Sequence, residues 1–367
     1  MPGPRPLSGE NAMRRIGIPN VLAALTLGAL SLPLQGCGVL LSTFGVPARA
    51  PDTYVVRHGP EEYCVLSMPG LNRDQRTLRT VILGNPSVAT EESRLLFSAA
   101  PETDWIAIDR AGHGHSTRRE EPSPVDQARA LFTIADGRAG GRKHVLVVAS
   151  WSAGIAYYLA RQHPDRIAGV VLLGPEVVPD PSLQDCWAAL LDVWGLGPLL
   201  AETIGAPWAR WVSVPGQLDL AVGQDSTGQP WCGIRDRCVE LVSRPSNIRA
   251  MVRDEAAMLD FLRRFTPQIA AIDVPMVCLV GDRDHIVPVD RHAGALESLR
   301  PETRSFIVPG AGYQLHWTHP EVVAGAVRYV EALAGLQPGA EEPDPGEFGL
   351  PAEVGLSALR GVRPVPY

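Results

Sequence analysis

The chain has 367 residues, a length that suits two or three average domains or one large α/β domain with an insertion. Hydrophobic residues make up 45% of it and charged residues 20%, which excludes a globally disordered, collagen-like or coiled-coil chain. The net charge is −7 and no run of Lys or Arg is longer than a pair, so the composition argues against nucleic acid as a partner.

The first 50 residues differ from the rest and predict a leader. Arg14 and Arg15 precede an uncharged, mostly apolar stretch at residues 16–34, and Cys37 follows shortly afterwards. This pattern resembles a bacterial lipoprotein signal peptide, in which the cysteine is lipidated and becomes the mature N-terminus. An uncleaved signal anchor and another form of export are alternatives, because about 20 apolar residues can span a bilayer. We therefore expect an exported protein, held at the outer face of the bacterial cytoplasmic membrane by its lipid or anchor, or secreted.

The body of the chain alternates between strand-like and helix-like patterns. Two β-rich runs at 54–58 and 63–68 flank a Gly-Pro pair and predict an antiparallel hairpin. Later apolar runs fit strands buried on both faces, and they lie at 80–83, 105–109, 145–149, 170–173, 276–280 and 305–308. Helical patterns lie at 91–98, 124–135, 153–163 and 321–336. The alternation predicts an α/β fold with a doubly wound, mostly parallel sheet and an antiparallel start.

Residues 179–268 interrupt this alternation. They contain no strand-like run, several helix-like pieces and five of the eight tryptophans, so they predict a helical lid inserted into a core formed by 51–178 and 269–336. The tryptophans fit either a small core of the lid itself or the wall of an apolar substrate pocket. Residues 337–367 hold six prolines and no periodic pattern, which predicts a disordered tail.

Cysteine usage is compatible with export. Cys64 and Cys278 lie in apolar strand-like runs, where a cysteine usually acts as a small buried hydrophobic residue. Cys186, Cys232 and Cys238 all lie in the lid segment, so one disulfide could form there in an oxidising compartment, with the pairing left open. The Cys and His spacings indicate no metal site, and we expect neither a metal nor another cofactor.

The strongest chemical signal is the pentapeptide Ser-Trp-Ser-Ala-Gly at residues 150–154. It follows the run at 145–149 and opens the helical pattern at 153–163. A nucleophile elbow has this setting: a strained strand-to-helix turn exposes a serine hydroxyl at the start of a helix. The usual pattern is G-x-S-x-G, with Ser150 here in place of the first glycine. The pattern predicts Ser152 as the nucleophile.

With this elbow the chain resembles the α/β-hydrolase superfamily over residues 53–336. Leu83-Gly84-Asn85-Pro86 is similar to the loop that supplies one oxyanion N–H, with Leu83 where His is common. The resemblance implies an oxyanion hole formed by the backbone N–H groups of Asn85 and Ala153. Residues 109–116 resemble a characteristic turn of the family, in which His113 and His115 are expected to have structural roles.

The same resemblance implies an acid. Residues 281–288 are similar to the acid loop of the family, with Asp284 at the acid position and Asp282 as an ordinary solvated side chain. Glu176, which follows the run at 170–173, stands at an alternative acid position that some relatives use.

The loop at 310–320 resembles the histidine loop of the family, but Tyr313 occupies the position of the catalytic histidine. A phenol with a pKa near 10 would ionise at neutral pH only at a cost of about 3 units, or roughly 4 kcal/mol. His316 could replace the missing base if it shares a helix face with Tyr313. His319 is expected to pack at a helix start.

Three functions remain open. The favoured one is a serine hydrolase for an ester, lactone or amide of an apolar small molecule, in which Ser152 attacks, Asp284 orients the base and His316 is the base. The second is a non-hydrolytic enzyme that uses Tyr313 for an elimination, cyclisation or rearrangement. The third is a catalytically inactive binding module at the cell surface.

Overall fold

The computed structural model describes the chain at residues 48–71, 76–84, 87–180, 210, 214–222, 229–335 and 340–353. The predicted leader with Cys37 lies outside the described residues, and so do Asn85, Cys186 and four of the five lid tryptophans. In the ranges that are described, no helix is both long and apolar enough to cross a membrane.

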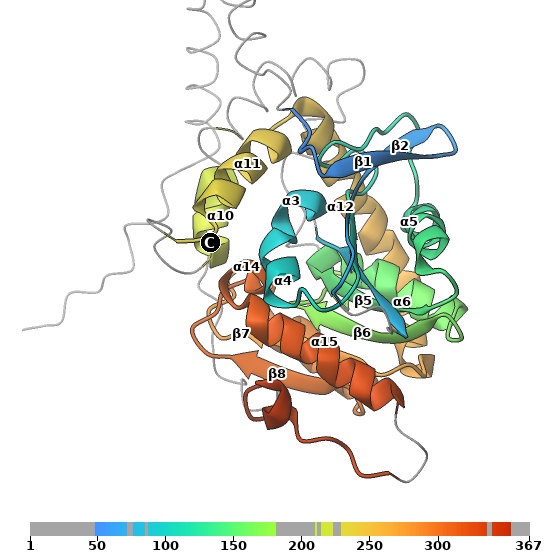
Figure 1. Ribbon diagram of the computed structural model, residues 1–367, viewed down its shortest axis with the longest axis vertical. Coiled ribbons are helices and arrows are strands. Elements are labelled where there is room, and N and C mark those ends of the chain that lie inside the picture. The colour runs from blue at the N-terminus through green and yellow to red at the C-terminus, as the bar shows by residue number, and fades with distance from the viewer. Residues whose placement is uncertain are drawn as a thin grey trace, which may run out of the picture. The chain divides into compact units, whose positions relative to one another are not determined.

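An eight-stranded sheet forms the centre of the fold, in the order β1-β2-β4-β3-β5-β6-β7-β8 (Figure 1). Its strands are β1 (Thr53–His58), β2 (Glu61–Met68), β3 (Thr77–Ile82), β4 (Trp105–Ile108), β5 (Lys143–Ala149), β6 (Ile167–Leu173), β7 (Met276–Gly281) and β8 (Arg304–Val308). β2 pairs antiparallel with β1 and β4, and every other pairing is parallel. This confirms the predicted fold class, including its antiparallel start.

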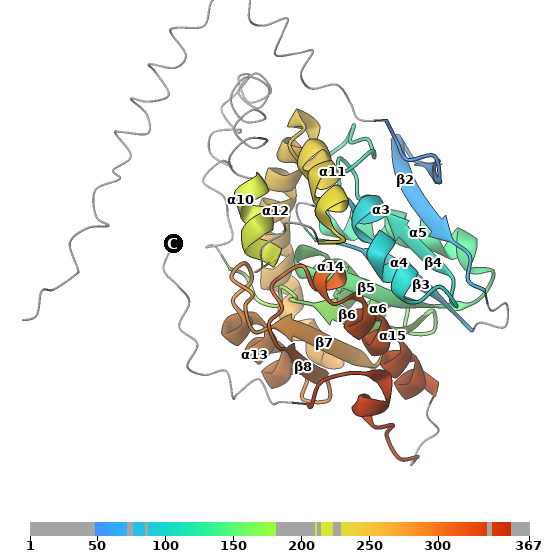
Figure 2. The same ribbon diagram turned by 60° about the vertical axis from the view of Figure 1, so that its left-hand side comes forward.

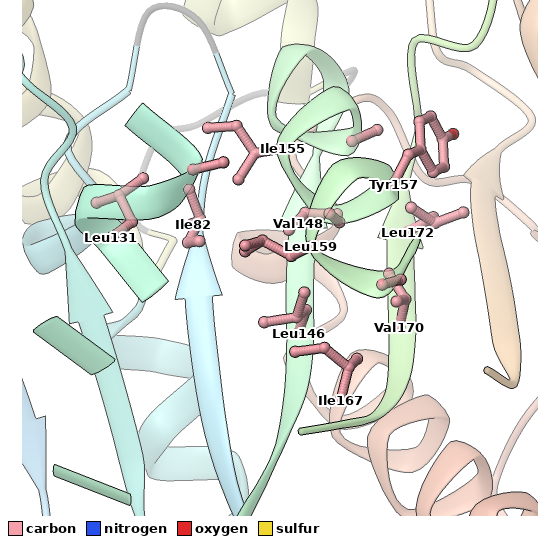
Figure 3. Close-up of a cluster of buried hydrophobic side chains, with 14 of the residues drawn as sticks. Ile82, Leu131, Leu146, Val148, Ile155, Tyr157, Leu159, Ile167, Val170 and Leu172 are labelled. Atoms are coloured by element: carbon pink, nitrogen blue, oxygen red, sulfur yellow. The ribbon is translucent and has the colours of Figure 1, made fainter. Parts of the chain in front are cut away.

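Helices cover both faces of the sheet because its central strands are apolar on both faces. On β5, Leu146 and Val148 face the layer with α5 (Pro124–Ala139), α6 (Ala153–Gln162), α12 (Pro245–Phe265) and α13 (Val289–Leu299). Figure 3 shows both side chains next to Leu131 of α5 and Ile155 and Leu159 of α6. Val145 and Val147 face the other layer, with α4 (Arg94–Ala99) and α15 (Pro320–Gly335). These two helices lie on the same side of the sheet (Figure 2). The alternation follows from the two-residue period of a strand.

Local signals set the ends of α5. The Ser123 hydroxyl accepts a hydrogen bond from the Asp126 N–H, and the Asp126 carboxylate accepts one from the Ser123 N–H. This capping box satisfies two backbone donors that the first turn leaves free. The helix ends at Gly140, whose φ of +59° suits a residue without a Cβ.

The described part of the insertion between β6 and β7 is helical. It contains α10 (Val214–Val222), α11 (Cys232–Val242), α12 and a short 3₁₀ helix, η6 (Thr266–Ala271). The N–H of Gln314, beside Tyr313, donates to the Ala221 carbonyl of α10 at 3.1 Å. A Cβ at Gly154 would lie 2.5 Å from Met258 Sδ of α12. The insertion therefore packs against both the 310–320 loop and the helix that follows the elbow.

Residues 340–353 differ from the predicted disordered tail. The 3₁₀ helix η7 (Pro345–Phe348) packs against α15, with the Phe348 ring 5.4 Å from that of Tyr329. Leu350 is buried, and Glu353 forms an isolated antiparallel bridge with Phe306 of β8. A few apolar residues at irregular spacing hold this segment, so no periodic pattern revealed it.

Candidate active site

The turn between β5 and α6 is strained at Ser150. Among the described residues, Ser150 is the one residue other than glycine with a positive φ, at 47°. Such a conformation costs on the order of 1–3 kcal/mol and persists where the surrounding structure enforces it. A single 3₁₀ turn, η2 (Ser150–Ser152), then leads into α6. The strained position of a nucleophile elbow is therefore occupied by Ser150.

Ser152 has a different environment from the one predicted. It has ordinary helical backbone angles, and its fully buried hydroxyl donates to the Leu83 carbonyl at 2.6 Å. The Ala153 N–H bonds to carbonyls of the same turn, at Ser150 and Trp151. The geometry thus disagrees with Ser152 as the nucleophile and with Ala153 as an oxyanion donor. The strand ends at Ala149, so the strained residue comes two positions earlier than the pentapeptide suggested.

Glu176 contacts the Ser150 hydroxyl directly. Ser150 Oγ donates to Glu176 Oε1 at 2.7 Å, and the Glu176 N–H donates to the Ser150 carbonyl at 3.2 Å. Burial raises the pKa of Glu176 to about 7, the nearby Asp180 charge acts in the same direction, and the Ser150 hydrogen bond and the Arg110 cation oppose it. A carboxyl group that titrates near neutral pH therefore lies against the elbow hydroxyl.

The Tyr313 phenol lies beside Ser150, because Gly84 approaches both side chains closely. Burial raises the pKa of Tyr313 well above its ordinary value of 10, with the negative charges of Glu176 and Asp284 acting in the same direction. Tyr313 is therefore a protonated hydrogen-bond donor at neutral pH.

Gly84 lies against this cluster at the end of β3. A Cβ at Gly84 would lie 2.8 Å from the Tyr313 hydroxyl oxygen and 3.1 Å from both Ser150 Cβ and the Ala149 carbonyl oxygen. Only glycine lets the chain pass so close to the elbow. Asn85, the expected oxyanion donor that follows it, is outside the described residues.

Asp284 lies beside Tyr313, after β7. Its Oδ1 accepts hydrogen bonds from the N–H groups of Ile286 at 2.8 Å and Val287 at 3.0 Å. A Cβ added to Gly174 would lie 3.0 Å from Asp284 Oδ2 and 3.9 Å from Tyr313 Cδ2, so these two side chains are neighbours. Desolvation raises the pKa of Asp284 to about 6. The structure thus brings Asp284 and Tyr313 together with the elbow.

His316 does not reach the elbow. Its Nε2 lies 3.3 Å from Glu92 Oε2 at the end of α3 (Ala89–Glu92), and both side chains are buried. Within the described residues, the Ser150 hydroxyl donates to the Glu176 carboxyl group and not to a histidine. The predicted base role of His316 thus disagrees with the geometry. The helix α14 (Leu315–Thr318) begins after Tyr313, so the two residues do not share a helix face.

The other candidate side chains have structural contacts. His113 Nε2 lies 3.0 Å from Asp254 Oδ2 in the core, and His319 Nδ1 lies 2.8 Å from the Thr318 hydroxyl. Asp282 is exposed and accepts a hydrogen bond from the Gly310 N–H at 2.7 Å. The described ranges contain no group of His, Cys, Asp and Glu side chains that could hold a metal ion.

Known proteins resemble the chain in sequence and in fold. A 2-succinyl-6-hydroxy-2,4-cyclohexadiene-1-carboxylate synthase from Serratia proteamaculans is 28% identical over 252 residues, covering 67% of this chain and 89% of the relative. A pimeloyl-(acyl-carrier protein) methyl ester esterase from Edwardsiella ictaluri is 24% identical over 226 residues, covering 60% of this chain and 80% of the relative.

A solved structure shares the fold. An alpha/beta hydrolase enzyme from a Medee basin deep-sea metagenome library superposes with a TM-score of 0.60 at 14% identity, over 79% of this chain and 99% of that one. The sequence profile of the Alpha/beta hydrolase family matches residues 84–326, more than half of the chain. The chain therefore belongs to the alpha/beta hydrolase family.

Proposed function

We propose that the protein is a serine hydrolase in which Ser150 is the nucleophile and Glu176, rather than a histidine, accepts its proton. The observation that carries this proposal is the 2.7 Å hydrogen bond from Ser150 Oγ to Glu176 Oε1 at a strained strand-to-helix turn. A nucleophile and its base must lie within hydrogen-bond reach of each other, and this pair does. The esterase among the relatives supports the same reaction class.

The reaction follows from these contacts. Ionised Glu176 takes the Ser150 proton as Oγ attacks the carbonyl carbon of an ester, lactone or amide, which forms an acyl-enzyme through a tetrahedral intermediate. Protonated Glu176 then gives that proton to the leaving oxygen or nitrogen. A water molecule repeats the attack with Glu176 as base, which releases the acid and restores Ser150.

Two donors can stabilise the oxyanion. The first is the Tyr313 O–H, which lies near Ser150, since a Cβ at Gly84 would be 2.8 Å from the Tyr313 hydroxyl oxygen and 3.1 Å from Ser150 Cβ. The backbone N–H of Trp151 follows the nucleophile, the position that supplies one oxyanion donor in this fold. Preorganised donors of this kind often provide the largest electrostatic contribution to such a reaction.

The pKa of Glu176 suits this role. A base works best when its pKa is near the working pH, and burial raises the pKa of this carboxyl to about 7. The activity should rise with pH through about 7, because the ionised form is the base.

The substrate class proposed is an apolar small molecule, with the helical insertion as a lid. Support comes from the insertion itself, whose helices α10 and α12 contact the 310–320 loop and the elbow helix. Its described tryptophan, Trp231, is buried. Deleting a lid over an apolar site should lower the preference for long acyl chains, which a series of p-nitrophenyl esters would measure.

Covalent labelling tests the proposed nucleophile. A fluorophosphonate probe should modify Ser150, as identified by peptide mass spectrometry. Labelling should vanish in Ser150→Ala, persist in the matched control Ser152→Ala, and slow at least 100-fold in Glu176→Gln, because amides are not bases. A label on Ser152, or wild-type labelling that Glu176→Gln leaves unchanged, would contradict the mechanism. Ligand binding without labelling or turnover would favour a binding module.

A second candidate is a proton-transfer enzyme for an elimination, cyclisation or rearrangement. The observation that favours it is the protonated phenol of Tyr313, which lies beside Ser150. A relative named as a synthase is compatible with this candidate. If the wild type resists the probe and Tyr313→His creates both labelling and esterase activity, the proton-transfer function is preferred.

For the location of the protein, we propose export and lipid attachment at Cys37. The support is the sequence pattern alone: a pair of arginines, an apolar stretch and a cysteine. Intact-mass analysis of the protein from its native membrane should give a chain that begins at an acylated Cys37, and Cys37→Ser should abolish the acylation. An unprocessed N-terminus would refute lipid attachment.

A further inference from the structure

A buried charge network joins α12 of the insertion to the core. The Asp254 carboxylate, in the middle of α12, accepts hydrogen bonds from Arg110, from Arg118 Nη1 at 2.7 Å and from Gln127 Nε2 at 2.9 Å, and it lies 3.0 Å from His113 Nε2. Asp254 and Arg110 are almost completely buried. Such a pair persists in the interior only when its hydrogen bonds are satisfied.

Arg110 connects this network to the elbow at two points. Its Nη2 donates to the Gly84 carbonyl at 2.7 Å, and its guanidinium lies 4.0 Å from the centre of the Trp151 ring. The Trp151 Nε1–H in turn donates to the backbone carbonyl of Asp254 at 2.9 Å. Arg110, Trp151 and Asp254 therefore form a closed ring of contacts, and Gly84 is joined to this ring through Arg110.

Two of these residues, Gly84 and Trp151, adjoin the nucleophile. Gly84 packs within about a van der Waals contact of Ser150 and the Tyr313 hydroxyl, as its Cβ distances show. Trp151 follows Ser150 directly and belongs to the same 3₁₀ turn. A planar guanidinium can bind a carboxylate, a carbonyl and a ring face at once, which an ammonium group cannot do.

We propose that Arg110 and Asp254 are positioning residues, through which α12 holds the Gly84 turn and the Trp151 indole in the arrangement that Ser150 requires. The inference rests on the proposed function for its kinetic readout. Its second readout is the titration of the Glu176 carboxyl group, which can be measured without any turnover. Neither residue needs to contact the substrate, since both act through Gly84 and Trp151.

Glu176 reports on this pair because the Arg110 charge reaches it. The charged and titratable groups that act on Glu176 or lie beside it are Arg110, Asp180, Tyr157 and Tyr313. Arg110 holds the pKa of Glu176 down, and Asp254 partly neutralises Arg110. Removing Asp254 alone and removing both members of the pair should therefore shift the Glu176 titration in opposite directions.

Four variants separate geometry from charge. Asp254→Asn leaves the Arg110 cation unneutralised, and the double variant Arg110→Met/Asp254→Leu removes both charges. Arg110→Lys keeps the positive charge but removes the planar guanidinium, whose two terminal nitrogens donate to Asp254 and to the Gly84 carbonyl. Arg118→Met is the matched control, since it removes a partner of Asp254 that contacts neither Gly84 nor Trp151. The double variant avoids the buried, unneutralised cation at residue 110 that Asp254→Asn leaves behind.

The experiment follows the Glu176 carboxyl by carbon NMR, with Glu176→Gln for assignment, and the hydrolysis of p-nitrophenyl butyrate as a function of pH. We expect the Glu176 pKa to fall in Asp254→Asn and to rise in the double variant. In Arg110→Lys, kcat should fall at least tenfold with little change in the pH of half-maximal activity. Arg118→Met should lower the melting temperature but leave kcat and the carboxyl titration unchanged.

Two results would overturn the inference. The first is an unchanged Glu176 titration in the double variant, and the second is a kcat of Arg110→Lys equal to that of Arg118→Met. In both cases Ser150 labelling still tests the proposed function separately. If the Glu176 titration shifts as expected but the fluorophosphonate probe does not label the wild type, the positioning roles are supported and the proposed serine-hydrolase function is refuted.

Discussion

Replacing Glu176 by glutamine should make the folded protein more stable at alkaline pH while it impairs the proposed chemistry. Glutamine has nearly the same shape, and its Oε1 can still accept the Ser150 hydrogen bond, which is 2.7 Å long in the wild type. The substitution removes the cost of ionising a buried carboxyl group. The variant therefore removes the negative charge of residue 176 but keeps the hydrogen bond from Ser150.

The magnitude follows from the two pKa values. The pKa of Glu176 rises from an ordinary value of 4.5 to about 7 in the folded protein, a difference of about 2.5 units or roughly 3 kcal/mol. Between pH 4.5 and 7 the folded state keeps a proton that the unfolded chain has released, so the free energy of unfolding decreases as pH rises through this window. Glu176→Gln lacks this decrease.

Urea unfolding of both proteins at pH 5 and pH 8 measures this effect. The difference in the free energy of unfolding, variant minus wild type, should be about 2–3 kcal/mol larger at pH 8 than at pH 5. The other titrating groups are common to both proteins, so their contributions cancel. A difference in stability that does not change with pH would show that Glu176 is not a carboxyl with a raised pKa. It would also remove the basis for its role as a base near neutral pH.

Three further substitutions test the assignment of the neighbouring residues. Ser152→Ala should lower the free energy of unfolding by about 1–2 kcal/mol, because it leaves the buried Leu83 carbonyl without its donor, and urea titration would measure this. Gly84→Ala should reduce esterase activity at least tenfold and lower the melting temperature, since its Cβ would lie 2.8 Å from the Tyr313 hydroxyl oxygen; wild-type kinetics in this variant would contradict the close approach. His316→Gln should cost about 2 kcal/mol by weakening the buried contact to Glu92, and the pH profile of the activity should keep its midpoint; a displaced midpoint would return His316 to the mechanism.

The structure brings together some of the predicted site residues and separates others. Tyr313 and Asp284 lie together beside the elbow, and Ser150, not Ser152, is the strained residue. One signal could have revealed this. The apolar run ends at Ala149, so the residue directly after it is the first that can adopt the sharp turn. The sequence predicts Glu176 only as an alternative acid, and no pattern in it indicates that this carboxyl group contacts the serine directly.

The amino-acid pattern alone predicts the layered α/β architecture, because continuous apolar runs that alternate with helical patterns leave few ways to bury both faces of a sheet. The contact between the Ser150 hydroxyl and the Glu176 carboxyl group appears only in the folded chain. A φ of +47° at Ser150 and the contact with Glu176 depend on where β5 and β6 end side by side, and spacing along the chain does not encode distances between strands. The Arg110 and Asp254 contacts have the same origin, since packing of α12 against the core brings together residues 144 positions apart.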